Sequence, residues 1–369
     1  MLYPRFCALA GIFTLAAAPL SALAQDSSAP PTPTRRRPPI VITDTARARE
    51  LFVSKDPKDL AGCGSQCAVQ IAAKHRTDSI YAAKAPGLYE FRKITYKSRA
   101  DGLEIPAYLF APIDKGSVKH AALVWVHGGV HGDWSTLMFP FVREAVQRGY
   151  VVITPDYRGS TGYGDAYYKL IDYGGKEVDD VLSAVDYLQT LPNVDMDRLG
   201  IMGWSHGGFI TSHILFRGKI PFRAGAAIVP VTNLIFRLSD HGPGYQRSYS
   251  PEPGIQGLPF EKVDEYIQRS PVFHVENLQV PMLVHVATND CDVYFREDQQ
   301  MVYTLRALKP DLAETKIYVD PAYRPGSGGC GHTFSRRVDP ATLERDDTPE
   351  QIDSWERTWT FFEWNLRPR

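Results

Sequence analysis

The 369-residue chain has almost no net charge and no internal repeat. Its 41 lysines and arginines balance 42 acidic residues, which leaves a formal net charge of −1. A chain so balanced lacks the basic surface that binds nucleic acid or anionic membranes, so we expect no nucleic-acid partner. Blades of a β-propeller repeat every 40 to 50 residues or so, and the absence of such a period excludes them.

Long hydrophobic runs are also missing beyond the amino terminus. There, Arg5 precedes an almost wholly apolar stretch at 6–20, and Ala-Leu-Ala follows at 22–24. A bilayer-spanning helix needs about 20 apolar residues, whereas this order is typical of a secretory signal peptide. We expect a signal peptide at 1–24, cleaved before Gln25. No membrane span would then remain, and the mature protein would be periplasmic or secreted; a retained anchor is the alternative.

Cysteine is scarce, with five in the chain. Removal of Cys7 with the signal peptide leaves four, and an even number in an oxidising compartment favours two disulfides. The spacing of Cys63 and Cys67 also resembles half of a metal site. No nearby Cys/His pair with ligand spacing completes it, so we expect no metal and no cofactor.

The rest of the chain divides into a proline-rich, disordered linker at 25–40, a lead-in segment at 41–90 and one catalytic domain at 91–369. Within that domain, apolar strands alternate with amphipathic helices. Strands are expected at 92–97, 105–110, 121–126, 150–154, 197–202, 224–229, 281–287 and 316–319, and helices at 139–148, 178–188, 296–308 and 349–365. This alternation predicts an α/β fold with a mostly parallel, doubly wound sheet covered by helices on both faces. The Pro/Gly-rich stretch at about 232–270 interrupts it, which suggests a small lid insertion.

The most informative motif is Gly-Trp-Ser-His-Gly-Gly at 203–208, between an expected strand and an expected helix. Strand, Gly-x-Ser-x-Gly and helix form the nucleophile elbow of α/β-hydrolases. The turn holds the serine hydroxyl out at the end of the sheet, where a histidine can reach it. Ser205 is therefore the predicted nucleophile. The alternative is a glycine-rich turn with a solvated serine.

Chain order selects the partners of Ser205. In this fold the acid and then the histidine follow the serine, and His332 is the only histidine after the penultimate expected strand. Asp290 and Asp292 both follow the strand at 281–287. We expect Asp290, which comes first, to orient the base, and Asp292 to cap the following helix.

Backbone amides should hold the oxyanion. We expect them to come from His206, directly after the nucleophile, and from Gly129 in the loop after the strand at 121–126. The side chains of His127, Phe236 and Tyr245 are candidates for the substrate pocket, although a structural role is an equal alternative for each.

The predicted triad also brings two cysteines together. Cys291 adjoins Asp290, and Cys330 lies two residues before His332. A hydrogen bond between that carboxylate and imidazole would bring the cysteines within disulfide reach. We expect a bond between Cys291 and Cys330, with Cys63 and Cys67 forming a second; buried free thiols are the alternative.

At this point the chain resembles the catalytic domain of the prolyl oligopeptidase family of serine peptidases over roughly residues 90–366. The resemblance rests on His-Gly-Gly at 127–129, Asp-Tyr-Arg-Gly-Ser-Thr-Gly-Tyr-Gly at 156–164, the elbow at 203–208, Arg-Ser-Pro at 269–271 and Asp-Cys-Asp-Val at 290–293. It implies an α/β-hydrolase fold with the triad Ser205, Asp290 and His332. Departures include His206 where tyrosine is usual, Asp156 where asparagine is frequent, and Val286 where glycine is usual. The family's propeller is missing.

We expect a serine hydrolase that acts on peptide or acyl-amide bonds in a peptide or small acyl substrate. An esterase with the same triad is the closest alternative, and a hydrolase-like domain that only binds ligands is a remote one. The sequence gives no expectation for oligomeric state, acyl preference, or endo- against exo-action.

Overall fold

A computed structural model describes residues 57–113, 118–252, 254–323 and 330–367. The signal peptide, the linker and the first part of the lead-in segment lie outside these residues and stay predictions. No helix in the described ranges is long and apolar enough to cross a bilayer.

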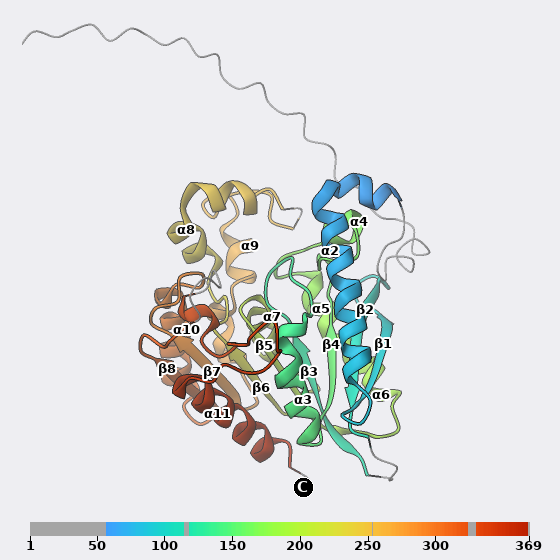
Figure 1. Cartoon of the computed structure of the whole chain (residues 1–369). Helices are drawn as coiled ribbons and strands as arrows, with labels where there is room; N and C mark the ends of the chain where they lie inside the picture. Colours follow the sequence, from blue (N-terminus) through green and yellow to red (C-terminus); the bar gives the residue numbers. More distant parts are fainter. Residues whose placement is uncertain (1–56, 114–117, 253, 324–329, 368–369) are drawn as a thin grey trace, which may run out of the picture. The chain divides into compact units, whose positions relative to one another are not determined.

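An eight-stranded sheet forms the centre of the fold, in the order β1-β2-β4-β3-β5-β6-β7-β8 (Figure 1). The strands are β1 (Glu90–Lys97), β2 (Glu104–Ala111), β3 (His120–Val126), β4 (Val151–Pro155), β5 (Val194–Trp204), β6 (Ala224–Ile228), β7 (Met282–Ala287) and β8 (Ala313–Tyr318). β1 with β2, and β2 with β4, are antiparallel, and every later pairing is parallel. The expected strands are all present, which confirms the α/β-hydrolase architecture.

Helices cover both faces of the sheet. They are α2 (Pro57–Lys84), α3 (Phe139–Gln147), α4 (Asp165–Tyr168), α5 (Lys176–Leu182), α6 (Ala184–Gln189), α7 (His206–Leu215), α8 (Leu234–Tyr249), α9 (Val263–Gln268), α10 (Phe295–Leu308) and α11 (Pro349–Asn365). One apolar cluster packs α2, α3 and α11 on the sheet, and a second packs α5, α6, α7 and α10 on the opposite face. The helix expected at 178–188 is broken into α5 and α6 at Ser183.

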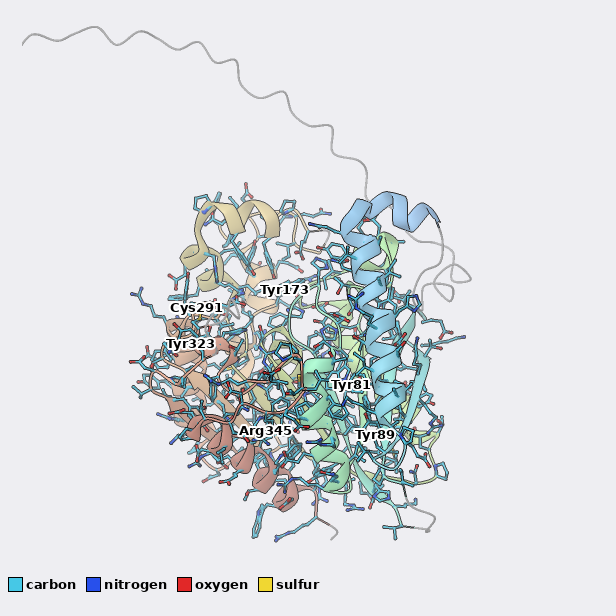
Figure 2. All side chains as sticks on the ribbon, in the orientation of Figure 1. Tyr81, Tyr89, Tyr173, Cys291, Tyr323 and Arg345 are labelled. Carbon is cyan, nitrogen blue, oxygen red and sulfur yellow. A yellow bond between two sulfur atoms is a disulfide. The ribbon has the colours of Figure 1, made fainter. Side chains whose placement is uncertain are left out.

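The described part of the lead-in segment is a long helix, α2, that is anchored in the domain. Tyr81 is fully buried among aromatic rings of the first two strands and α3, including Phe110 at 5.1 Å between ring centroids (Figure 2). Lys74 is 1% exposed; it donates to Trp134 O at 3.1 Å and pairs with Asp156. Because Trp134 ends the loop after β3, α2 supports a loop at the carboxyl edge of the sheet.

The Pro/Gly-rich insertion is more helical than the sequence suggested. It contains α8 and α9, which Figure 1 shows together at one end of the molecule. α8 bends at Gly242, whose φ of 71° is outside the helical region, directly before Pro243. Apolar side chains of α8, among them Leu234 and Leu238, join the core cluster. The insertion therefore packs on the domain through its first helix.

Candidate active site

Three loops at the carboxyl ends of the parallel strands β5, β7 and β8 bring the predicted catalytic residues to one edge of the sheet. Ser205 follows β5, and its backbone has a φ of 55°, in the left-handed region that non-glycine residues rarely adopt. A Cβ on Gly203 would lie 2.4 Å from the backbone of Gly207, and one on Gly207 would lie 2.4 Å from Val126 O. The elbow therefore requires glycine at both positions.

His332 and Asp290 lie together at this edge. His332 Nδ1 is 2.7 Å from Asp290 Oδ2, and both side chains are nearly buried. The other carboxylate oxygen, Oδ1, accepts the backbone amides of Asp292 and Val293, each at 2.9 Å. These bonds fix the position of the carboxylate. The carboxylate accepts a hydrogen bond from Nδ1, so the neutral imidazole carries its proton on Nδ1 and Nε2 is the basic nitrogen.

The structure corrects the expected role of Asp292. This residue does not cap α10, whose N-cap is Tyr294. Its carboxylate accepts a hydrogen bond from Arg237 Nη2 at 2.8 Å, and its other oxygen lies 3.6 Å from His332 Nε2. The half-exposed carboxylate is thus a neighbour of the basic nitrogen, and Arg237 of α8 holds it there.

Ser205 Oγ makes no hydrogen bond with His332 among the described residues. The serine is 7% exposed, and its own backbone amide donates to Ile228 O at 3.0 Å. Hydrogen bonds between a nucleophile and its base commonly form or tighten only in the substrate complex. Proton transfer requires Nε2 and Oγ to come within hydrogen-bond reach of each other.

The two amides predicted for the oxyanion hole are available. Gly129 has a φ of 78°, and its carbonyl accepts a hydrogen bond from Tyr157 Oη at 2.5 Å, which holds the loop in place. His206 is the first residue of α7, where helix geometry leaves the amide without an acceptor. In the described ranges, neither amide donates a hydrogen bond.

The side chain of His127, a pocket candidate, is buried in the protein, and so is that of His206. His206 is 1% exposed, and its ring packs against those of Tyr173 and Phe209. Burial lowers the pKa of His206 well below its ordinary value, so its imidazole is neutral. His127 stacks on Tyr157 and bonds Ser160 Oγ through Nε2 at 2.9 Å, which fits the structural alternative.

The two pocket candidates of the lid lie on α8. Phe236 is half-buried, and its amide donates to Asn233 Oδ1 at 3.1 Å, which caps the helix. Tyr245 Oη accepts from Arg237 Nε at 2.9 Å. The guanidinium of Arg237 also donates to Asp292, so it joins α8 to the loop of the acid. No local sequence pattern marks Arg237, because its carboxylate partner lies on a distant loop.

The structure confirms the predicted bond between Cys291 and Cys330, whose Cα atoms are 5.7 Å apart. Cys291 is labelled in Figure 2. Cys67 also belongs to a disulfide. The side chain of Cys63, its expected partner, lies outside the described part of the chain.

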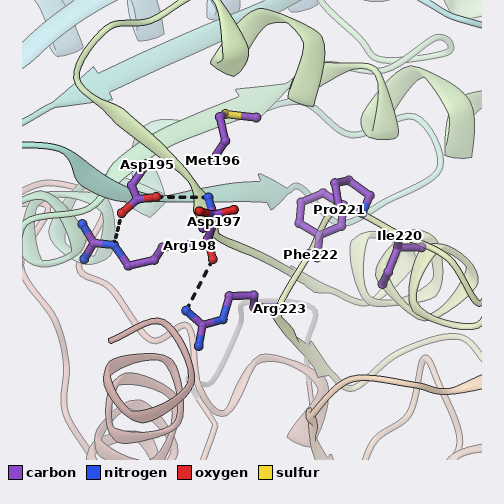
Figure 3. Close-up of a pocket in the computed structure, with 8 residues that line it drawn as sticks. All are labelled: Asp195, Met196, Asp197, Arg198, Ile220, Pro221, Phe222 and Arg223. Carbon is purple, nitrogen blue, oxygen red and sulfur yellow. Dashed lines mark hydrogen bonds and ion pairs between the residues drawn. The ribbon is translucent and has the colours of Figure 1, made fainter. Parts of the chain in front are cut away.

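The described part of the chain also contains pockets, one far from Ser205 and one beside Asp290. One, of about 510 Å³, is lined by residues 195–198 in the first part of β5 and by residues 220–223 before β6, at the edge opposite Ser205 (Figure 3). Its charges are satisfied internally, since Asp195 accepts from Arg198 at 2.8 Å. Another, of about 470 Å³, borders Asp290 and Asp240. Within the described residues, no group of three or more His, Cys, Asp or Glu side chains is placed to hold a metal.

Comparison with known proteins agrees with this geometry. The model of the prolyl oligopeptidase family matches residues 138–328. Acylamino-acid-releasing enzyme 1 of Oryza sativa subsp. japonica is 27% identical over 262 residues, covering 66% of this chain and 33% of that protein. The uncharacterized peptidase YuxL of Bacillus subtilis (strain 168) is 29% identical over 259 residues, covering 69% of this chain and 37% of that protein. The chain thus spans about a third of the length of these relatives.

A solved structure supports the fold. The puromycin-hydrolyzing peptidase of Mycobacterium tuberculosis superposes with a TM-score of 0.62 at 24% identity, over 76% of this chain and 40% of that one. At that identity, the likeness bears on the architecture alone.

Proposed function

Since the chain belongs to the prolyl oligopeptidase family, we propose that it is a serine hydrolase that cleaves peptide or acyl-amide bonds through an acyl-enzyme on Ser205. The observation that carries the proposal is the pairing of His332 with Asp290 at 2.7 Å beside the nucleophile elbow. A fixed imidazole at the same edge of the sheet as the serine is the arrangement that nucleophilic catalysis needs.

In the proposed mechanism, His332 Nε2 removes the proton of Ser205 Oγ as the oxygen attacks the substrate carbonyl. The amides of Gly129 and His206 donate to the oxyanion of the tetrahedral intermediate. The imidazolium then passes its proton to the leaving amine, and the acyl-enzyme forms. In the second half of the reaction, water attacks the acyl-enzyme by the same steps, and His332 is again the base. Asp290 keeps Nδ1 protonated and stabilises the imidazolium in both halves.

The relatives favour a peptide or acylated amino-acid substrate. The relatives described above are an acylamino-acid-releasing enzyme and an uncharacterized peptidase. In this chain, α8 would border the substrate entrance, because Arg237 links it to Asp292 beside Nε2. We therefore propose that the insertion at about 232–270 acts as a lid and contributes to selection.

The experiment is a comparison of kcat/KM for aminoacyl and N-acyl-aminoacyl p-nitroanilides with matched p-nitrophenyl acyl esters. An amide substrate turned over by the wild-type protein and not by Ser205→Ala supports the peptidase. Hydrolysis of esters alone supports the esterase, which uses the same residues. Binding without turnover of any compound would support the non-enzymatic alternative.

We also propose that the protein is exported, on the strength of the charged, apolar and small-residue order at 1–24. The disulfide between Cys291 and Cys330 fits an oxidising compartment. Mass spectrometry of protein from the periplasm or medium should find an amino terminus at or near Gln25. Protein that keeps Met1 and sediments with membranes would instead support a retained anchor.

A further inference from the structure

We propose that Arg336 binds a carboxylate of the substrate beside the scissile bond. This proposal rests on the proposed function, because it names a feature of the substrate of the same site. Arg336 lies four residues after His332, and its guanidinium extends to the loop that carries the oxyanion glycine. A Cβ placed on Gly128 would lie 3.3 Å from Ser205 Cβ and 3.5 Å from Arg336 Nη1. The cation and the nucleophile therefore border the same point.

The guanidinium of Arg336 has no protein acceptor in the described ranges. Its Nε is buried and makes no hydrogen bond there, and no carboxylate of those residues lies within ion-pair distance. Other arginines with little exposure differ: Arg158 pairs with Asp180 at 2.8 Å, and Arg237 pairs with Asp292 at 2.8 Å. A half-buried cation without a hydrogen-bonded anion is costly unless a ligand supplies one.

The backbone around Arg336 is held in place, so its direction is a property of the fold. The amide of Arg336 donates to Thr333 O at 3.0 Å. The preceding Ser335 is fixed from two sides, because its hydroxyl accepts from Trp204 Nε1 at 2.7 Å and its carbonyl from Trp355 Nε1 at 2.8 Å. The segment after His332 therefore aims the arginine at the nucleophile.

The electrostatic surroundings fit a carboxylate-binding role. Burial lowers the pKa of Arg336 to about 10, against the opposing effect of Asp290 and Asp292. The group stays charged at neutral pH and offers its planar fork of donors, which matches the geometry of a carboxylate. Two carboxylates of a peptide substrate would reach this point: the terminal carboxylate of a short leaving group, or an acidic acyl group.

Two matched pairs of substrates distinguish these sources. N-acetyl-alanyl-alanine is compared with N-acetyl-alanyl-alaninamide for the leaving side, and succinyl-alanyl with acetyl-alanyl p-nitroanilide for the acyl side. In one of the two pairs, kcat/KM of the wild-type protein should be about 10- to 100-fold higher for the substrate with the carboxylate than for its neutral counterpart. This is the range expected for one charge-assisted hydrogen bond. Arg336→Gln should reduce that ratio to about 1 and leave the neutral member of the pair nearly unchanged.

Arg337→Gln is the control, because this neighbouring arginine already pairs with Asp346 at 2.7 Å and should leave the ratio unaltered. If Arg336→Gln does not fold, Arg336→Lys keeps the charge and should lower the ratio without abolishing it. A wild-type protein with no preference in either pair would overturn the proposal, and so would a preference that survives Arg336→Gln. Equal loss on charged and neutral substrates would show that Arg336 only balances the charge of Asp290. Hydrolysis of the neutral substrates tests the proposed function separately.

Discussion

Cys291 and Cys330 form a disulfide that joins the loop of Asp290 to the loop of His332. The loops that carry Asp290 and His332 are thus joined by a covalent bond as well as by the 2.7 Å contact between His332 Nδ1 and Asp290 Oδ2. The bond closes a segment with a sequence separation of 39. In the chain-entropy model, this disulfide adds about 3–4 kcal/mol to the free energy of unfolding.

Mild reduction should therefore lower activity before the domain unfolds. Cleavage of the bond frees the loop before His332 to leave the geometry that Asp290 requires, while the sheet and both core clusters stay intact. Activity and circular dichroism are measured together across a dithiothreitol titration. The double variant Cys291→Ser/Cys330→Ser should show the reduced activity without reductant and respond little to it. Simultaneous loss of activity and secondary structure would contradict this expectation.

The two carboxylates beside His332 should differ in importance. Asp290→Asn should lower kcat by about 10³- to 10⁴-fold, because an amide there favours the wrong imidazole tautomer. Asp292→Asn should cost less, since Asp292 makes no hydrogen bond with the imidazole and contacts it only at 3.6 Å. Both variants are measured on one neutral anilide. A greater loss for Asp292→Asn would show that the acid is misassigned.

Lys74 should matter for stability far more than an exposed lysine. Lys74→Met leaves Asp156, which is 1% exposed, and Asp133 without their cation. Removing one partner of a buried pair costs about 3–5 kcal/mol. The control is Lys176→Met, because Lys176 is half exposed and pairs with Asp101 at 3.2 Å, and such surface pairs contribute about 0–1 kcal/mol. Urea denaturation gives both free energies of unfolding, and equal values would refute the anchoring role of α2.

Glu177 should make stability depend on pH. Burial raises its pKa from 4.5 to about 8, against the amide of Gly174 that lowers it. Between these values the unfolded chain has lost the proton and the folded protein keeps it, so the free energy of unfolding falls as pH rises. The slope has an upper limit of about 1.4 kcal/mol per pH unit.

The free energy of unfolding is compared between wild type and Glu177→Gln from about pH 5 to pH 8. The difference, wild type minus variant, should decrease steadily over that range. Glu356→Gln, which changes an exposed residue of α11, should give a constant difference. A constant difference for Glu177→Gln as well would mean that Glu177 is ionised in the folded protein throughout.

The sequence predicted the strands and the residues at their carboxyl ends because both follow from local pattern and chain order. Ser205 is identified by the glycines on either side of it, Gly203 and Gly207. A side chain at either position would collide with neighbouring backbone. His332 and Asp290 follow from topology, and their spacing to the cysteines implied the disulfide. These inferences need no knowledge of how distant side chains meet.

Other features depend on tertiary contacts that no local pattern records. Asp292 precedes a helix and looks like its cap, yet Arg237 of α8 holds it beside His332. The helical content of the insertion was hidden by Gly242 and Pro243, which bend α8 without ending it. The position of Arg336 beside Gly128 likewise depends on how the segment after His332 packs against Trp204.

The role of Ser205 as nucleophile is tested most directly by active-site labelling with a fluorophosphonate, followed by peptide mapping, on protein assayed with the same neutral anilide. We expect one label per chain, on Ser205, and a loss of anilide hydrolysis in proportion to labelling. Ser205→Ala should neither label nor hydrolyse the anilide. A label on another residue, or hydrolysis that persists in fully labelled protein or in Ser205→Ala, would contradict the assignment of Ser205 as the nucleophile.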